Sequence, residues 1–245
     1  MRTKKYIRTA VIVVIWLAIW QILALVVNNN VLLAGPVETV KALISLGSSS
    51  LFWLSVGSTI GMVLIGYLAG LILGTLLAVL SYRFKYVKEF FGPFITVIKS
   101  IPIVSFIIIA LIWAGSKNAS IIVSAIVTFP IFYKNILEGL FSTDPKMLDL
   151  AKVFRMKTSR KVRYVFLPSL APHIKSAVSL AIGMAFRGGI TAEVVGQPLR
   201  SIGNGLYKAK VNLATAEMLA WTLVAVLAAF AVERLFAFIV KKVLK

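Results

Sequence analysis

The feature that most constrains the fold of this chain is a series of long apolar runs. Six of them lie near 9–27, 54–80, 93–114, 119–138, 173–196 and 214–239. Each is long enough to cross a bilayer, because a membrane helix needs about 20 apolar residues at about 1.5 Å each. A soluble chain of 245 residues does not need 60% hydrophobic and only 14% charged residues. The sequence therefore predicts an all-α integral membrane protein with about six transmembrane helices.

The first apolar run resembles a secretory signal peptide, because a basic N-terminal segment precedes it. The run continues as far as Val27, and no small-residue cleavage site follows it. We therefore expect a retained first transmembrane helix. We assign residues 1–245 to one multi-pass domain of the plasma membrane.

The net charge of +19 is of the size found in nucleic-acid-binding proteins, but the basic residues are distributed differently. They lie in short clusters between the apolar runs, which is the positive-inside pattern of membrane proteins. We expect a lipid bilayer, and no nucleic acid, as the partner of these charges. The chain contains no cysteine, which excludes disulfides and thiolate metal sites.

The positions of the basic clusters predict the orientation of the chain. Six helices place both termini on one side, together with the basic loops near 83–88 and 140–172. The loops of the other side hold only five basic residues, which are Lys41, Lys117, Arg200, Lys208 and Lys210. Because cytoplasmic loops carry the excess of Lys and Arg, we expect both termini and the 140–172 loop in the cytoplasm.

Two patterns indicate how the helices are arranged. Residues 35–47 combine Pro36 near a helix start with Gly47 after its end, which predicts a short external helix. It is either an amphipathic helix on the membrane surface or an ordinary loop helix. Glycines spaced by four residues in the second run favour close helix packing over a role in substrate binding. They are Gly57, Gly61, Gly66, Gly70 and Gly74.

The 140–172 loop predicts two short helices. Asp144 and Pro145 can cap and start the first; Thr158 and Ser159 can cap the second, which Pro168 then ends. Four apolar residues of the first helix recur as one stripe, namely Met147, Leu148, Ala151 and Phe154. A stripe of this kind in water is typical of a partner site. The alternative is a helix that lies on the lipid headgroups.

The same loop resembles the Glu-Ala-Ala loop of ABC-transporter permeases. Asp149, Leu150 and Ala151 occupy the Glu-Ala-Ala positions, and the family's Ile-x-Leu-Pro falls on 165–168, where Val165 replaces the isoleucine. Arg155 stands at the family's glycine position. Because an arginine does not easily take a positive φ, we expect a different turn or a helix that is one turn longer. Asp149 is also shorter than the family's glutamate, which changes its expected contact.

The resemblance extends over most of the chain and is closest to permeases of the nitrate/sulfonate/taurine importer group. The segments outside the loop that resemble this group are 99–104, 113–115, Phe129-Pro130 and 192–196. It implies a type I importer fold, two permease copies, two cytoplasmic ATPase subunits and an external solute-binding protein. The coupling residues that it implies are Asp144, Met147, Leu148, Asp149, Ala151, Phe154, Arg155, Leu167 and Pro168. The chain has no Walker A motif, so no cofactor is expected on it, and ATP and magnesium belong to the partner ATPase.

Ionisable residues inside apolar runs are costly and are candidates for a functional site. We expect Lys99, Arg187 and Glu193 in the translocation path, or Arg187 and Glu193 in a dimer interface. A structural salt bridge and snorkelling of Arg187 to the membrane surface are the alternatives. Lys134 is expected to snorkel to the cytoplasmic surface. His173, the single histidine, is expected to be an interfacial residue without chemistry.

No nucleophile–base arrangement is visible, so the chain is not expected to be an enzyme. The leading hypothesis is the membrane subunit of an ATP-driven importer of a small solute. The solute would be a sulfonate-, nitrate- or taurine-like anion, or a vitamin- or pyrimidine-like compound. The alternatives are a secondary transporter, which would normally show inverted repeats and membrane carboxylates, and a scaffold for a cytoplasmic partner.

Overall fold

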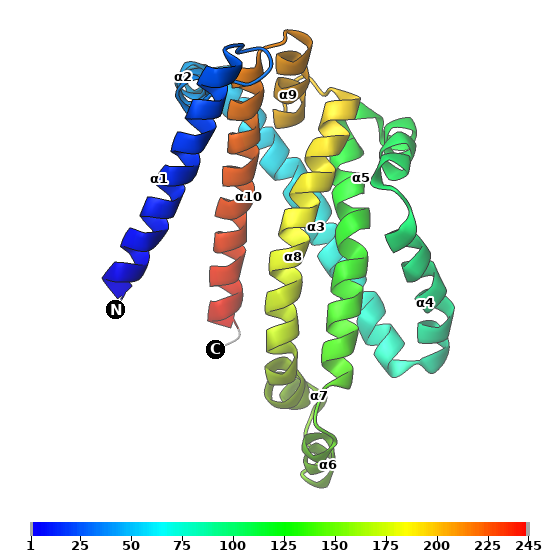
Figure 1. The fold of residues 1–245 in the computed structure, drawn as a ribbon. Helices are drawn as coiled ribbons and strands as arrows, with labels where there is room; N and C mark the ends of the chain where they lie inside the picture. Colours follow the sequence, from blue (N-terminus) through cyan, green and yellow to red (C-terminus); the bar gives the residue numbers. More distant parts are fainter. Residues whose placement is uncertain (1, 244–245) are drawn as a thin grey trace.

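The computed structural model describes the backbone of residues 2–243 and the side chains of residues 7–242. The part of the chain that it describes is helical without strands, and the helices are joined by short turns (Figure 1). The elements are α1 (Arg2–Val27), α2 (Pro36–Gly47), α3 (Ser50–Arg83), α4 (Lys85–Ser100), α5 (Ile103–Phe141), α6 (Pro145–Val153), α7 (Thr158–Lys161), the π-helix η1 (Val162–Phe166), α8 (Leu167–Gly196), α9 (Ile202–Val211) and α10 (Thr215–Val243). This confirms the all-α membrane class.

Five helical stretches among the described residues are long and apolar enough to cross a membrane. They are Ile7–Val27, Ser50–Arg83, Ile103–Phe141, Thr158–Gly196 and Thr215–Lys242. The predicted membrane fold is confirmed, with five such stretches in the described chain where about six were expected. The predicted run 93–114 is divided between the end of α4 and the start of α5. The division occurs because Pro102 keeps Ile101 in an extended conformation, with ψ 131°.

Gly115 reverses the chain inside α5. Its φ of 68° and ψ of 175° lie in a region that is open essentially to glycine alone. Figure 1 shows α4 and the first part of α5 on one side of the molecule, next to the long remainder of α5, which runs back towards α6. The two pieces before Gly115 thus make a broken crossing in place of the predicted third helix.

α5 lies at the centre of the bundle, between α3 and α8. Gly66, Gly70 and Gly74 allow the close approach of α3: a Cβ at Gly66 would lie 2.2 Å from the carbonyl oxygen of Ile121. The predicted packing role is confirmed for these three glycines. It is wrong for Gly57 and Gly61 within this chain, since a Cβ at either would meet no atom within 4 Å.

The two ends of the bundle carry different short helices. α2 and α9 lie at one end, and α6 and α7 lie at the other (Figure 1). The predicted helix over 35–47 is confirmed as α2, which packs against α1, α3 and α10. The beginning of α1 and the end of α10 point towards the end that carries α6. Both ends of the described chain therefore lie on the side of the 140–172 loop.

Candidate functional site

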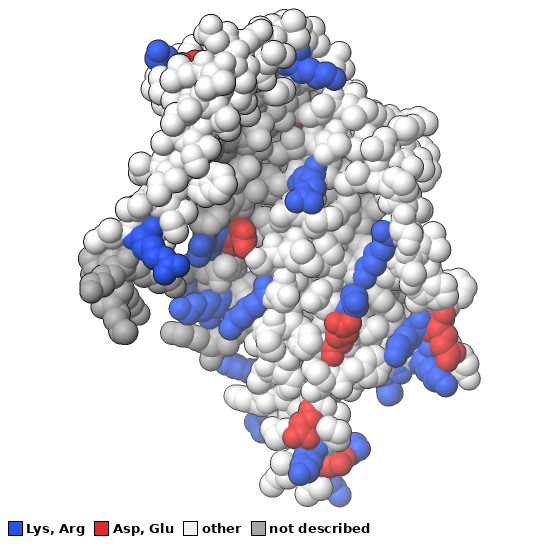
Figure 2. All heavy atoms as spheres, in the orientation of Figure 1, with Lys and Arg blue, Asp and Glu red and all other residues white. Residues whose placement is uncertain are grey.

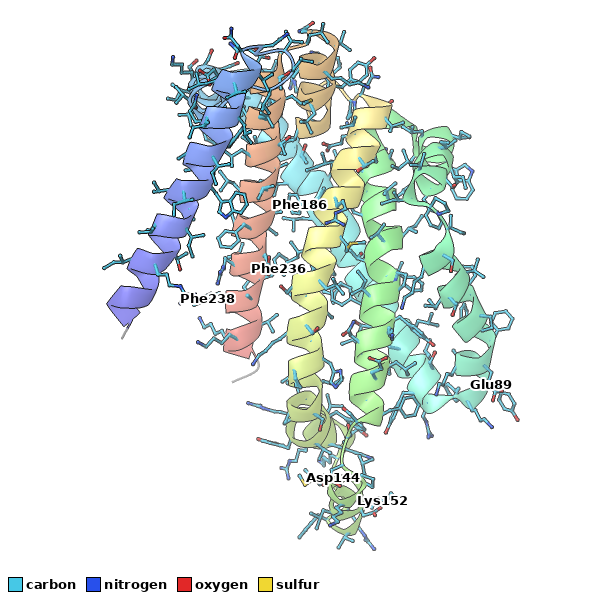
Figure 3. The ribbon with its side chains drawn as sticks, in the orientation of Figure 1. Glu89, Asp144, Lys152, Phe186, Phe236 and Phe238 are labelled. Carbon is cyan, nitrogen blue, oxygen red and sulfur yellow. The ribbon has the colours of Figure 1, made fainter. Side chains whose placement is uncertain are left out.

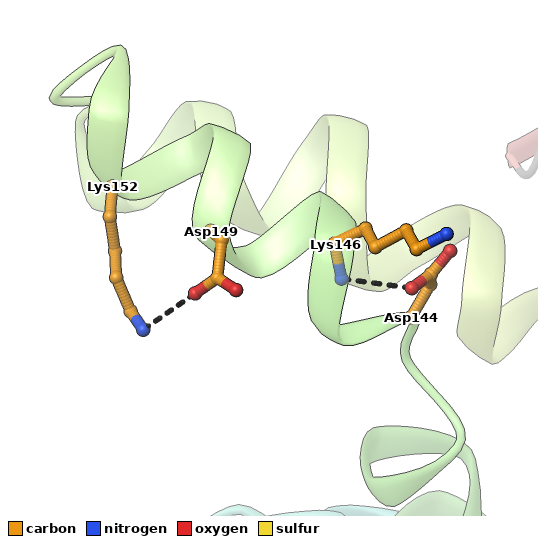
Figure 4. Close-up of polar contacts among 4 residues, drawn as sticks. All are labelled: Asp144, Lys146, Asp149 and Lys152. Atoms are coloured by element: carbon orange, nitrogen blue, oxygen red, sulfur yellow. Dashed lines mark hydrogen bonds and ion pairs between the residues drawn. The ribbon is translucent and has the colours of Figure 1, made fainter.

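The loop helix α6 begins as its sequence predicts. Asp144 is the N-cap, and its Oδ1 accepts a hydrogen bond of 2.9 Å from the backbone N–H of Lys146 (Figure 4). Pro145 occupies the first turn, where a missing N–H has no cost. One turn later, Lys152 Nζ donates to Asp149 Oδ1 at 2.9 Å in an exposed ion pair. Asp149 is thus held on the polar side of α6.

The helix ends at Val153 in a turn that is built around Arg155. Met156 N–H donates to Ala151 O and Arg155 N–H donates to Lys152 O, each at 2.9 Å, which is the Schellman pattern. This pattern needs a left-handed residue, and Arg155 supplies it with φ 46°. The expectation that an arginine here avoids a positive φ is therefore wrong, and α6 does not run one turn longer. Arg155 takes a left-handed conformation that glycine adopts easily, although it costs a non-glycine residue roughly 1–2 kcal/mol.

The predicted apolar stripe of α6 is divided between two sides of the helix. Ala151 is only 3% exposed and Leu148 is half-buried, so these two side chains face the loop itself. The residues that point outward are Met147, Leu150, Val153 and Phe154, which we call the outer face of α6. Leu150 and Val153 were missed, although both follow Met147 at intervals of three residues, a spacing that places them on one side of a helix.

After the turn at 154–157, the chain enters the membrane body through α7, η1 and α8. Thr158 is the first residue of α7, and Lys157 precedes it without a side-chain cap, so the predicted cap by Thr158 and Ser159 is wrong. Pro168 does not end the helix, because it lies in the first turn of α8, after the π-helix η1. Its ring lacks an N–H and would clash with an α-helical carbonyl four residues earlier, and the wider turns of η1 relieve both problems. Val165 is buried and Leu167 is half-buried at this junction.

The α6 loop projects from the end of the bundle. Figure 3 shows Asp144 and Lys152 on the projecting helix, away from the spanning helices. Between α6 and the bundle lies a hollow of about 820 Å³. Its lining includes Leu148 and Lys152 from α6, Phe141 from the end of α5 and Tyr82 from the end of α3. The outer face of α6 has no such cover among the described residues.

Glu193 joins three helices near the opposite end of the molecule. The side chain is 2% exposed, and its Oε2 accepts hydrogen bonds from Thr59 Oγ1 at 2.8 Å and from Gly203 N–H at 3.1 Å. The Thr59 hydroxyl in turn accepts from Ile202 N–H at 2.9 Å. The carboxylate therefore connects α8 with α3 and α9. Glu193 also borders a hollow of about 550 Å³. That Glu193 lines the path of the solute stays a prediction.

Arg187 and Glu193 do not pair. Arg187 is exposed, and no ion pair to it is found among the described residues. The salt-bridge alternative is therefore wrong for this pair. Arg187 follows Leu180 by seven residues, or almost two full turns, so both lie on one side of α8.

A further hollow, of about 480 Å³, lies between α4, α5 and α8. Its polar lining consists of Lys99, Lys134, Asn135 and Glu138, and the remaining walls are apolar. Lys134 Nζ and Glu138 Oε1 form a pair at 3.7 Å. The structure thus brings Lys134 together with Lys99, which sequence reasoning had treated separately. Figure 2 shows Lys and Arg side chains on this face, over α8 and beside α5.

His173 joins two helices of the bundle. Its Nε2 lies 3.3 Å from Ser142 Oγ, so it joins the start of α8 to the end of α5. No group of three or more His, Cys, Asp or Glu residues that could hold a metal ion occurs in the described part of the chain.

Known proteins with similar folds include solved importers. The chain is similar to the inward-facing MetNI methionine ABC transporter, with a TM-score of 0.60 over 78% of this chain and 96% of that one. It is also similar to an amino acid ABC transporter, with a TM-score of 0.55 over 79% and 91% of the two chains. The sequence identities are 16% and 18%, so these likenesses concern the fold alone. They confirm the predicted importer permease fold.

Similar sequences are permeases with different named substrates. The formylaminopyrimidine transport permease ThiX of Halalkalibacterium halodurans is 28% identical over 74% of this chain and 72% of its own. The provisionally named aliphatic sulfonates permease SsuC of Bacillus subtilis is 26% identical over 74% of this chain and 66% of its own. The nitrate import permease NrtB of Synechocystis is 22% identical over 83% and 76%.

One family model matches most of the chain. Residues 66–245 match the binding-protein-dependent transport system inner membrane component. The matched region contains α5, the α6 loop and α8, which form the centre of the fold and its projecting loop. The chain therefore belongs to this family and is an ABC importer permease.

Proposed function

We propose that this permease works as two copies that together form the path of a small solute, and that each copy binds a separate ATPase subunit through α6. The observation that carries the proposal is the outer face of α6. Met147, Leu150, Val153 and Phe154 are exposed, and α6 itself lies beyond the end of the helix bundle (Figure 1). Burying an apolar side chain of this size contributes roughly 1.5–3 kcal/mol, so these four residues can supply the apolar centre of a docking surface.

The connection from α6 to the membrane body supports coupling. The residues Thr158–Gly196 form one continuous helical stretch, which includes α7, η1 and α8. A displacement of α6 by an ATPase would pass through the four-residue turn at 154–157 and then reach α8 along this stretch. In the proposed cycle, ATP binding closes the ATPase dimer, draws the two α6 loops together and opens the path outward. The ATPase binds ATP and magnesium, and α6 of this chain transmits the resulting movement to α8.

The remaining partners and the orientation belong to the same proposal. An external solute-binding protein would deliver the solute at the end that carries α2 and α9. The termini and the α6 loop would lie in the cytoplasm, where the ATPase is. The relatives are named for sulfonates, formylaminopyrimidine and nitrate, which supports a small solute without choosing one.

Docking on the outer face of α6 is tested by co-purification of the tagged permease with its candidate ATPase subunit. Wild type should retain one ATPase per permease, and the double variant Met147→Glu, Phe154→Glu should lose it, because two charges would enter an apolar interface. The control is Val37→Glu, Val40→Glu on α2, where two exposed apolar residues lie at the opposite end. It should retain the ATPase.

Two outcomes would contradict this proposal. If wild type recruits no ATPase, the proposed coupling through α6 fails. If the control loses the ATPase as fully as the α6 variant, the loss reflects general damage and α6 is not the docking surface.

A further inference from the structure

The hollow between α6 and the bundle is lined by positive charges and aromatic rings. Its volume is about 820 Å³, and its cationic lining residues are Arg83, Lys152 and Lys161. No Asp or Glu is among the described residues that border it. We propose that this hollow binds the phosphodiester headgroup of an anionic phospholipid, such as phosphatidylglycerol, from the surrounding membrane. This binding goes beyond the proposed function, because it needs the membrane alone and no ATPase.

The hollow lies where two spanning helices end. The spanning stretch Ser50–Arg83 ends at a residue that lines the hollow, and so does the stretch Ile103–Phe141. α6 projects beyond these two ends (Figure 3). The hollow therefore lies at the depth of the lipid headgroups, and the acyl chains of a bound lipid would lie beside the spanning helices. Basic pockets between membrane helices at this depth are typical sites for anionic headgroups.

Two cations of the hollow lack a carboxylate partner. Lys152 is paired with Asp149 at 2.9 Å, whereas Arg83 and Lys161 take part in no ion pair among the described residues. Like charges that line one hollow repel each other, and an anion between them would supply the missing counter-charge. A phosphodiester fits this requirement, because its charged oxygens accept strong hydrogen bonds from Arg and Lys.

Three aromatic rings line the same hollow. The ring centre of Tyr82 lies 5.2 Å from that of Phe141 and 5.8 Å from that of Phe166, in edge-to-face pairs. Cations lie over the two outer rings: Lys88 Nζ is 4.4 Å from the centre of Phe141, and Lys161 Nζ is 5.6 Å from the centre of Phe166. Amphipathic rings are enriched at the level of lipid headgroups. This wall therefore suits the glycerol region of a lipid better than a free phosphate.

A headgroup in this hollow would connect the α6 loop to the membrane body. Arg83 belongs to the end of α3, Lys152 to α6 and Lys161 to α7. A phosphate that contacts these cations would hold the projecting loop against the bundle. Because a ligand that binds only the folded state stabilises it, the lipid should also raise the thermal stability of the permease.

Native mass spectrometry of the purified full chain tests the site. The permease is incubated with equal amounts of phosphatidylglycerol and phosphatidylcholine that carry the same acyl chains, and the lipid retained per chain is counted. Wild type should retain phosphatidylglycerol about tenfold more often, because the two headgroups share the phosphate but differ in net charge. Arg83→Gln with Lys161→Gln should bring this ratio close to one. Arg83→Lys with Lys161→Arg should keep most of it.

The matched control is Lys241→Gln with Lys242→Gln at the end of α10. This control removes the same number of positive charges from exposed residues that do not border the hollow but lie towards the same end of the bundle. It should keep the tenfold preference. An excess of glycerol 3-phosphate should leave the retained lipid in place, since this soluble compound has no acyl chains to bury.

Four results would overturn the proposal. Equal retention of the two lipids by wild type, or equal losses in the Gln variant and the control, would show that no specific site exists. Displacement by glycerol 3-phosphate would assign the hollow to a soluble phosphate compound. Loss of the lipid when the candidate ATPase binds would assign the hollow to the ATPase interface. The count on the permease alone needs no ATPase, so this site and the proposed coupling function can fail separately.

Discussion

Single residues hold the two ends of the molecule in their present geometry, and Arg155 does so under strain. At the α6 end, Arg155 keeps a left-handed conformation because two backbone hydrogen bonds of the Schellman turn require it. At the other end, the buried Glu193 carboxylate is satisfied by donors from Thr59 and Gly203. A buried carboxylate that lost such donors would destabilise the fold, so Glu193 has a structural role whatever else it does.

The strain at Arg155 predicts that Arg155→Gly stabilises the permease. Glycine accepts the positive φ without the steric cost of a Cβ, and the gain exceeds its larger unfolded-state entropy by about 1 kcal/mol. The measurement is the free energy of unfolding in detergent. Arg155→Ala is the control, because it removes the charge but keeps the Cβ, and it should give no gain. Equal stabilisation by both variants would assign the effect to the charge.

At the scale of elements, the fold depends on how closely α3 approaches α5. The glycines of α3 divide into two sets, because only the later three face α5. Tyr67 of α3 continues this contact with an edge-to-face ring pair to Phe132 of α5, with centroids 5.4 Å apart. Close packing of small residues is what holds neighbouring helices together where lipid removes the hydrophobic driving force.

Gly70→Ala should therefore destabilise the fold, whereas Gly61→Ala should not. A Cβ at Gly70 would lie 2.0 Å from Thr128 Oγ1 and 2.9 Å from Ala125 O, so the helices would have to separate. Overpacking of this kind costs typically 1–3 kcal/mol. A Cβ at Gly61 would meet open space. Thermal unfolding of both variants tests this, and equal losses would show that Gly61 is also packed, for example by a second copy.

At the scale of the whole molecule, the short helices at the two ends indicate which side meets which partner. The basic α6 loop and the two ends of the described chain lie together, and α9 lies at the far end. The proposed orientation predicts that Lys208→Cys on α9 reacts with a membrane-impermeant thiol reagent in intact cells. Lys242→Cys near the end of α10 should react only after permeabilisation. The reverse pattern would place the ATPase loop outside the cell and contradict the proposed function.

Much of the fold and of the loop followed from local sequence patterns. Apolar runs of about 20 residues identify spanning segments, because the thickness of the bilayer imposes that length on any helix. The cap at Asp144 was predictable for the same kind of reason, since its hydrogen bond reaches only two residues along the chain. The importer family could also be predicted, because the loop motif and the later motifs are continuous segments of the sequence.

The tertiary structure decided what depends on contacts between distant residues. The sequence shows that Leu148 and Leu150 are both apolar. Only the packing of the loop turns Leu148 inward and Leu150 outward. The Thr59–Glu193 bond joins residues 134 positions apart, and Lys99 meets Lys134 only because Gly115 reverses the chain. The sequence by itself determined the membrane class, the capped loop helix and the family. The turn at Arg155, the outer face of α6 and the lysine-lined hollow required the fold, because backbone geometry and long-range packing override local preference.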